Sequence, residues 1–210
     1  MKKGLVIVLL AVAVQVGAQS TDGLTEVFVD NFANNKNGWL IAETGKETSW
    51  VNYNEQRLVV DASKGASRIT MTAPKGFNGD FVLKATIWCK DCSGNKEASF
   101  GLLVGYSQFA TKGEEGWYQM QLNQENGDGV WVKANNPNGS TLYEQNAKAG
   151  FDPDDRNEIA IERKGEDVKY YVNGSEVFSN TSTETSGNKI TFMAGGKTKV
   201  FMSKISFHSN

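Results

Sequence analysis

Short segments in which apolar and polar residues alternate run through this chain, and residues 156–178 show the pattern best. Ile159 and Ile161 fall on one face of an extended segment, whereas the residues that flank them include two glutamates. A period of two residues is typical of a half-buried β-strand. After a return segment, Asn173-Gly174 offers the two positive-φ residues that a type I′ hairpin turn needs. We therefore expect three antiparallel strands in this stretch.

The same alternation recurs elsewhere, with Gly, Asn, Asp and Ser between the segments. The other expected strands are residues 26–30, 39–42, 48–53, 57–61, 68–73, 81–89, 99–107, 116–123, 130–134, 189–194 and 199–207. Phe100, Leu102, Val104 and Tyr106 are expected on one face of their strand. No window as long as a helix keeps a helical period, although residues 144–150 could form one helical turn. About a dozen short strands predict an all-β fold, a two-sheet antiparallel jelly-roll sandwich rather than one small barrel.

The N-terminal residues have the pattern of an export signal. Two lysines precede an apolar run at residues 5–14, and a small-residue cleavage signal follows at residues 16–18. The run is too short to span a membrane, and no later segment reaches that length. We expect a cleaved signal peptide at residues 1–18, a single domain at residues 19–210, and a periplasmic or extracellular location without membrane insertion.

Charge narrows the range of partners. Removal of Lys2 and Lys3 with the signal peptide changes the formal net charge from −2 to −4. This charge is small and mixed in sign along the chain, which argues against nucleic acid or an anionic membrane as partner.

The two cysteines, Cys89 and Cys92, form the sequence Cys-Lys-Asp-Cys. A thioredoxin-like redox pair would stand at the start of a helix, which this segment does not predict. A zinc half-site would need a second ligand pair, and the chain offers only His208. An exported protein more often oxidises such a pair, so we favour a structural disulfide.

Several motifs together resemble a known fold family. They are Val27–Phe32 with Asn37–Trp39, Ser99–Val104, Gly116–Leu122, and Asn157–Gly165 with Tyr170–Gly174. With these motifs the chain resembles the concanavalin A-like lectin/glucanase (laminin-G-like) jelly-roll domains of exported bacterial proteins. The resemblance covers nearly all of residues 19–210 and implies a curved, partly polar concave sheet. Its motifs are structural, and the last strand has Met202-Ser203 where relatives often carry acidic residues.

The resemblance transfers no catalytic residue. Laminarinase-type relatives carry Glu-x-Asp-x-Glu or Glu-x-Asp-x-x-Glu on one strand, which puts the acids on one face of a cleft, and neither pattern occurs here. Domains similar to 3-keto-disaccharide hydrolases share the fold, but no catalytic motif of theirs can be matched residue by residue. The single histidine, His208, makes histidine-based catalysis and histidine metal sites unfavourable.

Aromatic residues give the strongest indication of a binding function. Trp88, Trp117 and Trp131 each share the parity of polar neighbours rather than of the expected core, and Gln119 and Gln121 share the parity of Trp117. Flat apolar rings beside amides suit a sugar ligand, because the rings stack on C–H faces and the amides bind hydroxyls. The alternative is that these tryptophans cover a partly buried second face or form cross-strand pairs.

Asp152, Asp154 and Asp155 could bind calcium together with backbone oxygens, as some laminin-G-like relatives do at a sandwich rim. We favour the simpler interpretation, ordinary turn chemistry with no cofactor.

The sequence thus favours an exported, non-catalytic binding module that recognises carbohydrate on a tryptophan-bearing sheet face. The alternatives are a glycoside-active enzyme of the concanavalin A-like superfamily and a protein-interaction domain of the cell envelope.

Overall fold

A computed structural model of the chain describes residues 20–39, 48–90, 92, 95, 97–106, 117–125, 129–135, 141–146, 150–152, 155–181, 185 and 187–210. Residues 123–125, 129–135 and 141–146 are described by their backbone alone. The expected signal peptide at residues 1–18 lies outside the described residues.

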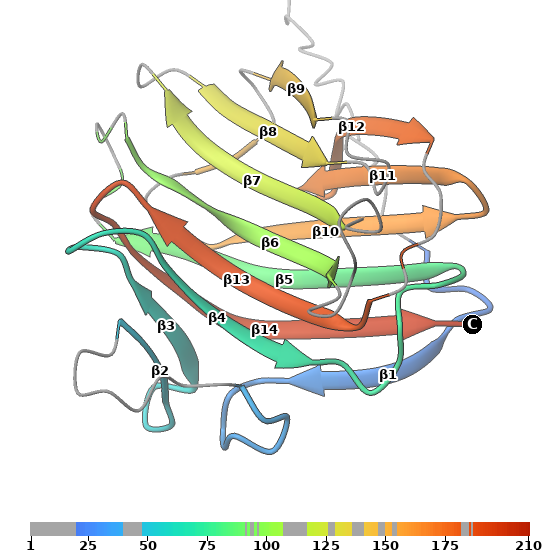
Figure 1. Cartoon of the computed structure of the whole chain (residues 1–210), viewed down its shortest axis with the longest axis horizontal. Coiled ribbons are helices and arrows are strands. Elements are labelled where there is room, and N and C mark those ends of the chain that lie inside the picture. The colour runs from blue at the N-terminus through green and yellow to red at the C-terminus, as the bar shows by residue number, and fades with distance from the viewer. Residues whose placement is uncertain are drawn as a thin grey trace, which may run out of the picture.

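The described residues form fourteen strands in two antiparallel sheets (Figure 1). The strands are β1 (Thr25–Asp30), β2 (Ser49–Asn52), β3 (Arg57–Asp61), β4 (Ser67–Thr72), β5 (Phe81–Lys90), β6 (Ser99–Tyr106), β7 (Tyr118–Glu125), β8 (Gly129–Asn135), β9 (Thr141–Asn146), β10 (Asn157–Lys164), β11 (Asp167–Val172), β12 (Ser175–Thr181), β13 (Lys189–Gly195) and β14 (Lys199–Ser209). The eight-stranded sheet has the order β12-β11-β10-β5-β14-β3-β2, with β1 also paired to β14, and the six-stranded sheet has the order β4-β13-β6-β7-β8-β9. The all-β, two-sheet expectation is confirmed.

The core fills the space between the two sheets. Each strand turns alternate side chains inward, so that Leu83, Ala85 and Ile87 of β5 are buried on one side and Tyr118 and Met120 of β7 on the other. Aromatic rings meet across the layer: the Phe81 and Tyr118 ring centroids lie 5.4 Å apart, and those of Phe77 and Phe207 lie 4.5 Å apart. Such pairs stabilise a core beyond the area that they bury.

Local turn chemistry behaves as expected at the Asn-Gly hairpin. Asn173 and Gly174 have φ angles of 49° and 79°, and the flanking residues Val172 and Ser175 are paired. Two consecutive positive φ angles in a two-residue loop define the type I′ turn. The preceding hairpin places Gly165, with φ 61°, at the first loop position, which suits a type II′ turn.

The N-terminal motif has a structural explanation. Asp30 is buried, and its carboxylate accepts hydrogen bonds from the backbone N–H of Phe32 at 2.8 Å and from Nε1 of Trp39 at 3.1 Å. The side-chain amide of Asn35 makes two hydrogen bonds to the backbone of Trp39: it accepts from the N–H and donates to the carbonyl. The motif therefore anchors a turn and a buried indole.

Two local expectations are wrong. Residues 144–146 belong to strand β9, not to a helical turn, because β8 offers them a ladder of backbone partners; residues 147–149 lie outside the described part. Tyr106 does not share the inward face of Val104, because Gly105 adopts φ 78° and the β6–β13 register shifts there. This bulge sends Tyr106 to the outer face.

Candidate functional site

The outer face of the six-stranded sheet carries a polar row along β7. Tyr118, Met120 and Leu122 of this strand are buried in the core, so the alternating residues Gln119 and Gln121 stand on the outer face. The expectation that these two amides share a face with Trp117 is confirmed.

Hydrogen bonds fix the orientation of this row. Trp117 Nε1 donates to Gln119 Oε1 at 3.3 Å, and Gln119 Nε2 donates to Gln121 Oε1 at 2.7 Å. An indole N–H can only donate, so the amide of Gln119 must turn its oxygen toward Trp117. The amide of Gln121 then turns its oxygen toward Gln119.

Tyr106, brought outward by the bulge at Gly105, packs edge-on against Trp117 with ring centroids 6.0 Å apart. Sequence parity placed Tyr106 in the core, and only the glycine at position 105 hinted at the bulge. The two rings form one wall of a hollow of about 420 Å³. Its lining residues come from three strands, β4, β6 and β13, and from the residue before β7: Arg68, Thr70, Leu103, Tyr106, Trp117, Lys189 and Thr191.

The charged groups of this hollow are cations. Arg68 and Lys189 line it, and none of its described lining residues is a carboxylate. Thr70 and Thr191 also line it, and a hydrogen bond of 2.9 Å joins their hydroxyls. These cross-strand partners were missed from the sequence, because they come from segments about 120 residues apart.

The three tryptophans do not share one face as expected. Trp88 belongs to β5 of the eight-stranded sheet, whereas Trp117 precedes β7 of the six-stranded sheet. The two strands are near in sequence, but the chain passes from one sheet to the other between β5 and β6. Trp131 pairs with Asn123 in the β7–β8 ladder, and its side chain lies outside the described part.

The acidic loop before β10 is organised by Asn157. The Asn157 amide accepts from the N–H of Asp152 at 2.9 Å and donates to the carbonyls of Asp152 at 2.7 Å and Asp155 at 2.9 Å. Asp154 lies outside the described residues, and within the described ones no cluster of three His, Cys, Asp or Glu residues is arranged to hold a metal. Calcium at this loop stays the untested alternative to the favoured interpretation, ordinary turn chemistry.

Cys89 and Cys92 are joined by a disulfide, with Cα atoms 5.7 Å apart, as expected from the sequence. The bond closes the end of β5.

A comparison with family models decides the family. The model for the 3-keto-alpha-glucoside-1,2-lyase-like domain matches residues 26–205, which is most of the chain. The chain belongs to this family. None of the curated proteins compared with this 3-keto-alpha-glucoside-1,2-lyase-like domain matches it.

Solved structures share the fold of this lyase-like domain. A β-glucanase from Bacillus licheniformis superposes with a TM-score of 0.65 at 10% identity, covering 86% of this chain and 96% of the other. The endo-β-1,3-glucanase from Pyrococcus furiosus gives 0.65 at 14% identity, with 89% and 94% covered. A GlcNAcα1-4Gal-releasing endo-β-galactosidase from Clostridium perfringens gives 0.67 at 9% identity, with 89% and 63% covered. At these identities the likeness establishes the jelly-roll fold.

Within the described part, the lyase-like domain has no helix long and apolar enough to cross a membrane.

Proposed function

We propose that this domain is an exported carbohydrate-binding module whose site is the outer face of the six-stranded sheet. The observation that carries the proposal is the hydrogen-bonded row Trp117–Gln119–Gln121 beside Tyr106. The disulfide between Cys89 and Cys92 supports export, since such bonds persist in oxidising compartments.

The residues of this row have different proposed roles in binding a sugar. Trp117 and Tyr106 are half-buried and offer ring surface for the C–H face of a sugar. Gln119 is 5% exposed and acts as a positioning residue, because its amide is held between its two neighbours. Gln121 is more exposed than Gln119, so its amide lies within reach of a ligand hydroxyl.

The chemistry of the lining supports a non-catalytic role. Glycoside hydrolysis on this fold uses a pair of carboxyl groups about 5–10 Å apart. The described lining residues of the hollow supply none, and the sequence lacks the acidic strand motif. Membership of a family named for a keto-glucoside supports a sugar as the ligand.

The family name also favours a second candidate, 1,2-elimination on a 3-keto-glucoside. The C3 carbonyl acidifies the proton on C2, so a base removes that proton while the C1 substituent leaves and takes up a proton as an alcohol. The product has a C1–C2 double bond conjugated with the C3 carbonyl. The readouts are the ultraviolet absorbance of this product and the release of the alcohol. If the wild-type protein turns over the substrate and Trp117→Ala loses that turnover, this activity replaces the non-catalytic proposal.

The test of binding is a broad glycan array probed with the mature protein, residues 19–210, with and without calcium. Trp117→Ala should lower retention on specific glycans about tenfold, because it removes the stacking surface and the donor that orients Gln119. Tyr53→Ala is the matched control, since it removes an exposed aromatic ring from a turn outside the six-stranded sheet.

Calcium dependence would direct attention to Asp152, Asp154 and Asp155. Unchanged retention in Trp117→Ala would contradict the site. A blank array would contradict sugar recognition and favour a protein partner of the cell envelope.

A further inference from the structure

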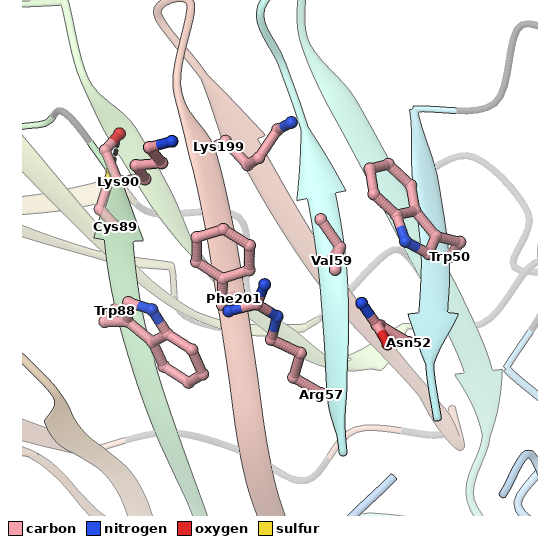
Figure 2. A pocket seen from close by; sticks show the side chains of 9 residues that line it. All are labelled: Trp50, Asn52, Arg57, Val59, Trp88, Cys89, Lys90, Lys199 and Phe201. Carbon is pink, nitrogen blue, oxygen red and sulfur yellow. Dashed lines mark hydrogen bonds between the residues drawn. The ribbon is translucent and has the colours of Figure 1, made fainter. Parts of the chain in front are cut away.

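A row of apolar side chains crosses four strands on the outer face of the eight-stranded sheet (Figure 2). Trp50 of β2 pairs with Val59 of β3, Val59 with Phe201 of β14, and Phe201 with Trp88 of β5. Neighbouring strands lie ~4.8 Å apart, so the row from Trp50 to Trp88 is about 14 Å long. Val59 and Phe201 are buried and the two tryptophans are half-buried, so the row forms the floor of a cleft of about 550 Å³.

Cations surround these rings. The guanidinium carbon of Arg57 lies 4.3 Å from the Phe201 ring centroid, and that of Arg156 lies 4.9 Å from the Trp88 centroid. Lys199 Nζ lies 5.7 Å from the Trp50 centroid. Lys90 also lines the cleft, and its described lining contains no carboxylate.

Carboxylates neutralise only part of this charge. Glu55 forms an ion pair with Arg57, and Asp61 pairs with Lys199 at 2.7 Å. Among the described residues, Lys90 and Arg156 have no carboxylate partner. The cleft is therefore a positive patch on a protein with a net negative charge.

We infer that this cleft is a second binding site, and that its ligand is an acidic saccharide with carboxylate or sulfate groups. Such a unit offers a rigid C–H face to the tryptophans and an anion to the cations at the same time. An acidic peptide supplies the anions on flexible side chains but no rigid face for the rings. The inference does not depend on the proposed function, because the two sites lie on different sheets.

The charge pattern also predicts how the ligand is held. Arg57 already lies over Phe201, with its Nε buried and without a hydrogen-bond partner. Lys90 is exposed at the end of β5, and Arg156 is exposed beside Trp88. Anionic groups of the saccharide would pair with these side chains, and its ring would cover the exposed part of Trp88.

Binding of oligogalacturonate, a carrageenan-type oligosaccharide that carries sulfate but no carboxylate, and neutral maltotetraose to the mature protein tests the site by calorimetry. An acidic oligosaccharide should bind, more weakly as salt rises, whereas the neutral one should not bind at this cleft. The two acidic probes distinguish carboxylate from sulfate. Trp88→Ala should weaken acidic binding about tenfold and Lys90→Gln combined with Arg156→Gln about fivefold.

Two controls separate loss of binding from loss of fold. Lys164→Gln removes an exposed lysine at the far end of β10 and should leave binding unchanged. Trp88→Phe keeps a ring and should restore most of the affinity lost in Trp88→Ala, with thermal unfolding recorded for every variant.

Three outcomes would overturn the inference. One is the absence of acidic binding in the wild type, and another is a loss caused by Trp117→Ala but not by the Trp88 and cation variants. The third is polyglutamate binding as tightly as the acidic saccharides, which would assign the cleft to an acidic peptide.

Discussion

Replacing Asn157 tests whether one buried side chain holds the loop before β10. Asn157 is fully buried, and its amide makes three hydrogen bonds to the backbone of Asp152 and Asp155 and accepts a fourth, at 2.9 Å, from Asn173 Nδ2. Asn157→Ala removes all four bonds. It also frees the segment that places Arg156 against Trp88.

The loss in the free energy of unfolding depends on whether each former partner of Asn157 can form a new hydrogen bond. A typical hydrogen bond contributes about 1 kcal/mol to stability, and a buried polar group left without a hydrogen-bond partner costs more. Asp152 and Asp155 are exposed, so water can replace part of what their backbone groups lose. The Asn173 amide keeps its bond of 2.6 Å to the Gly150 carbonyl. We therefore expect Asn157→Ala to lower the free energy of unfolding by about 2–3 kcal/mol.

Urea unfolding followed by tryptophan fluorescence measures this quantity. The matched control is Glu158→Ala, the neighbouring exposed residue, whose backbone N–H keeps its bond to Asn173 Oδ1 at 2.8 Å. That change should alter the free energy of unfolding by no more than about 0.5 kcal/mol. A loss below about 1 kcal/mol for Asn157→Ala would refute the claim that this amide anchors the loop.

Two further predictions concern the end of β5 and the edge of the cleft. Replacing Cys89 and Cys92 by serine should lower the free energy of unfolding by about 2 kcal/mol. The disulfide restricts the unfolded chain, and the loss is at the small end of the range because the closed loop is short. An unchanged urea midpoint would contradict this. Partial burial opposes ionisation of Asp61, yet hydrogen bonds from Lys199 and Ser63 outweigh it and lower its pKa to about 2. The stabilisation from Asp61 is therefore present above about pH 4 and lost as pH falls toward 2. Asp61→Asn should remove this part of the pH dependence of the free energy of unfolding. The effect should be at most about 1 kcal/mol, because the lysine of the pair is 38% exposed.

Features that depend on neighbours in sequence could be predicted. The turn at Asn173-Gly174 needs only two residues that tolerate positive φ, and both adopt it. The inward row of β5 follows from its period of two, and Leu83 and Ile87 are indeed buried. The disulfide follows from the short spacing of its cysteines and the expected compartment.

Features that depend on which strands pair could not be predicted. Trp88 and Trp117 have the same local pattern, but β5 pairs with β10 and β14 while β7 pairs with β6 and β8. Parity assigns a side chain to one of two faces of a strand and says nothing of the sheet to which that strand belongs. Tyr106 shows the second limit, since one bulge at Gly105 reverses the parity of the residue after it.

The separation of Trp88 and Trp117 onto two sheets makes the two proposed sites independent of each other. Packed sheets lie about 10 Å apart, and each tryptophan stands on the side of its sheet that faces away from the shared core. Substitutions so far apart, with no common partner, should have additive effects on stability, within about 0.5 kcal/mol. The double variant Trp88→Ala with Trp117→Ala should therefore lose the ligands of both faces, while each single variant loses only its own. A larger coupling, or loss of both ligands in one single variant, would mean that one ligand contacts both faces or that the two sheets respond together.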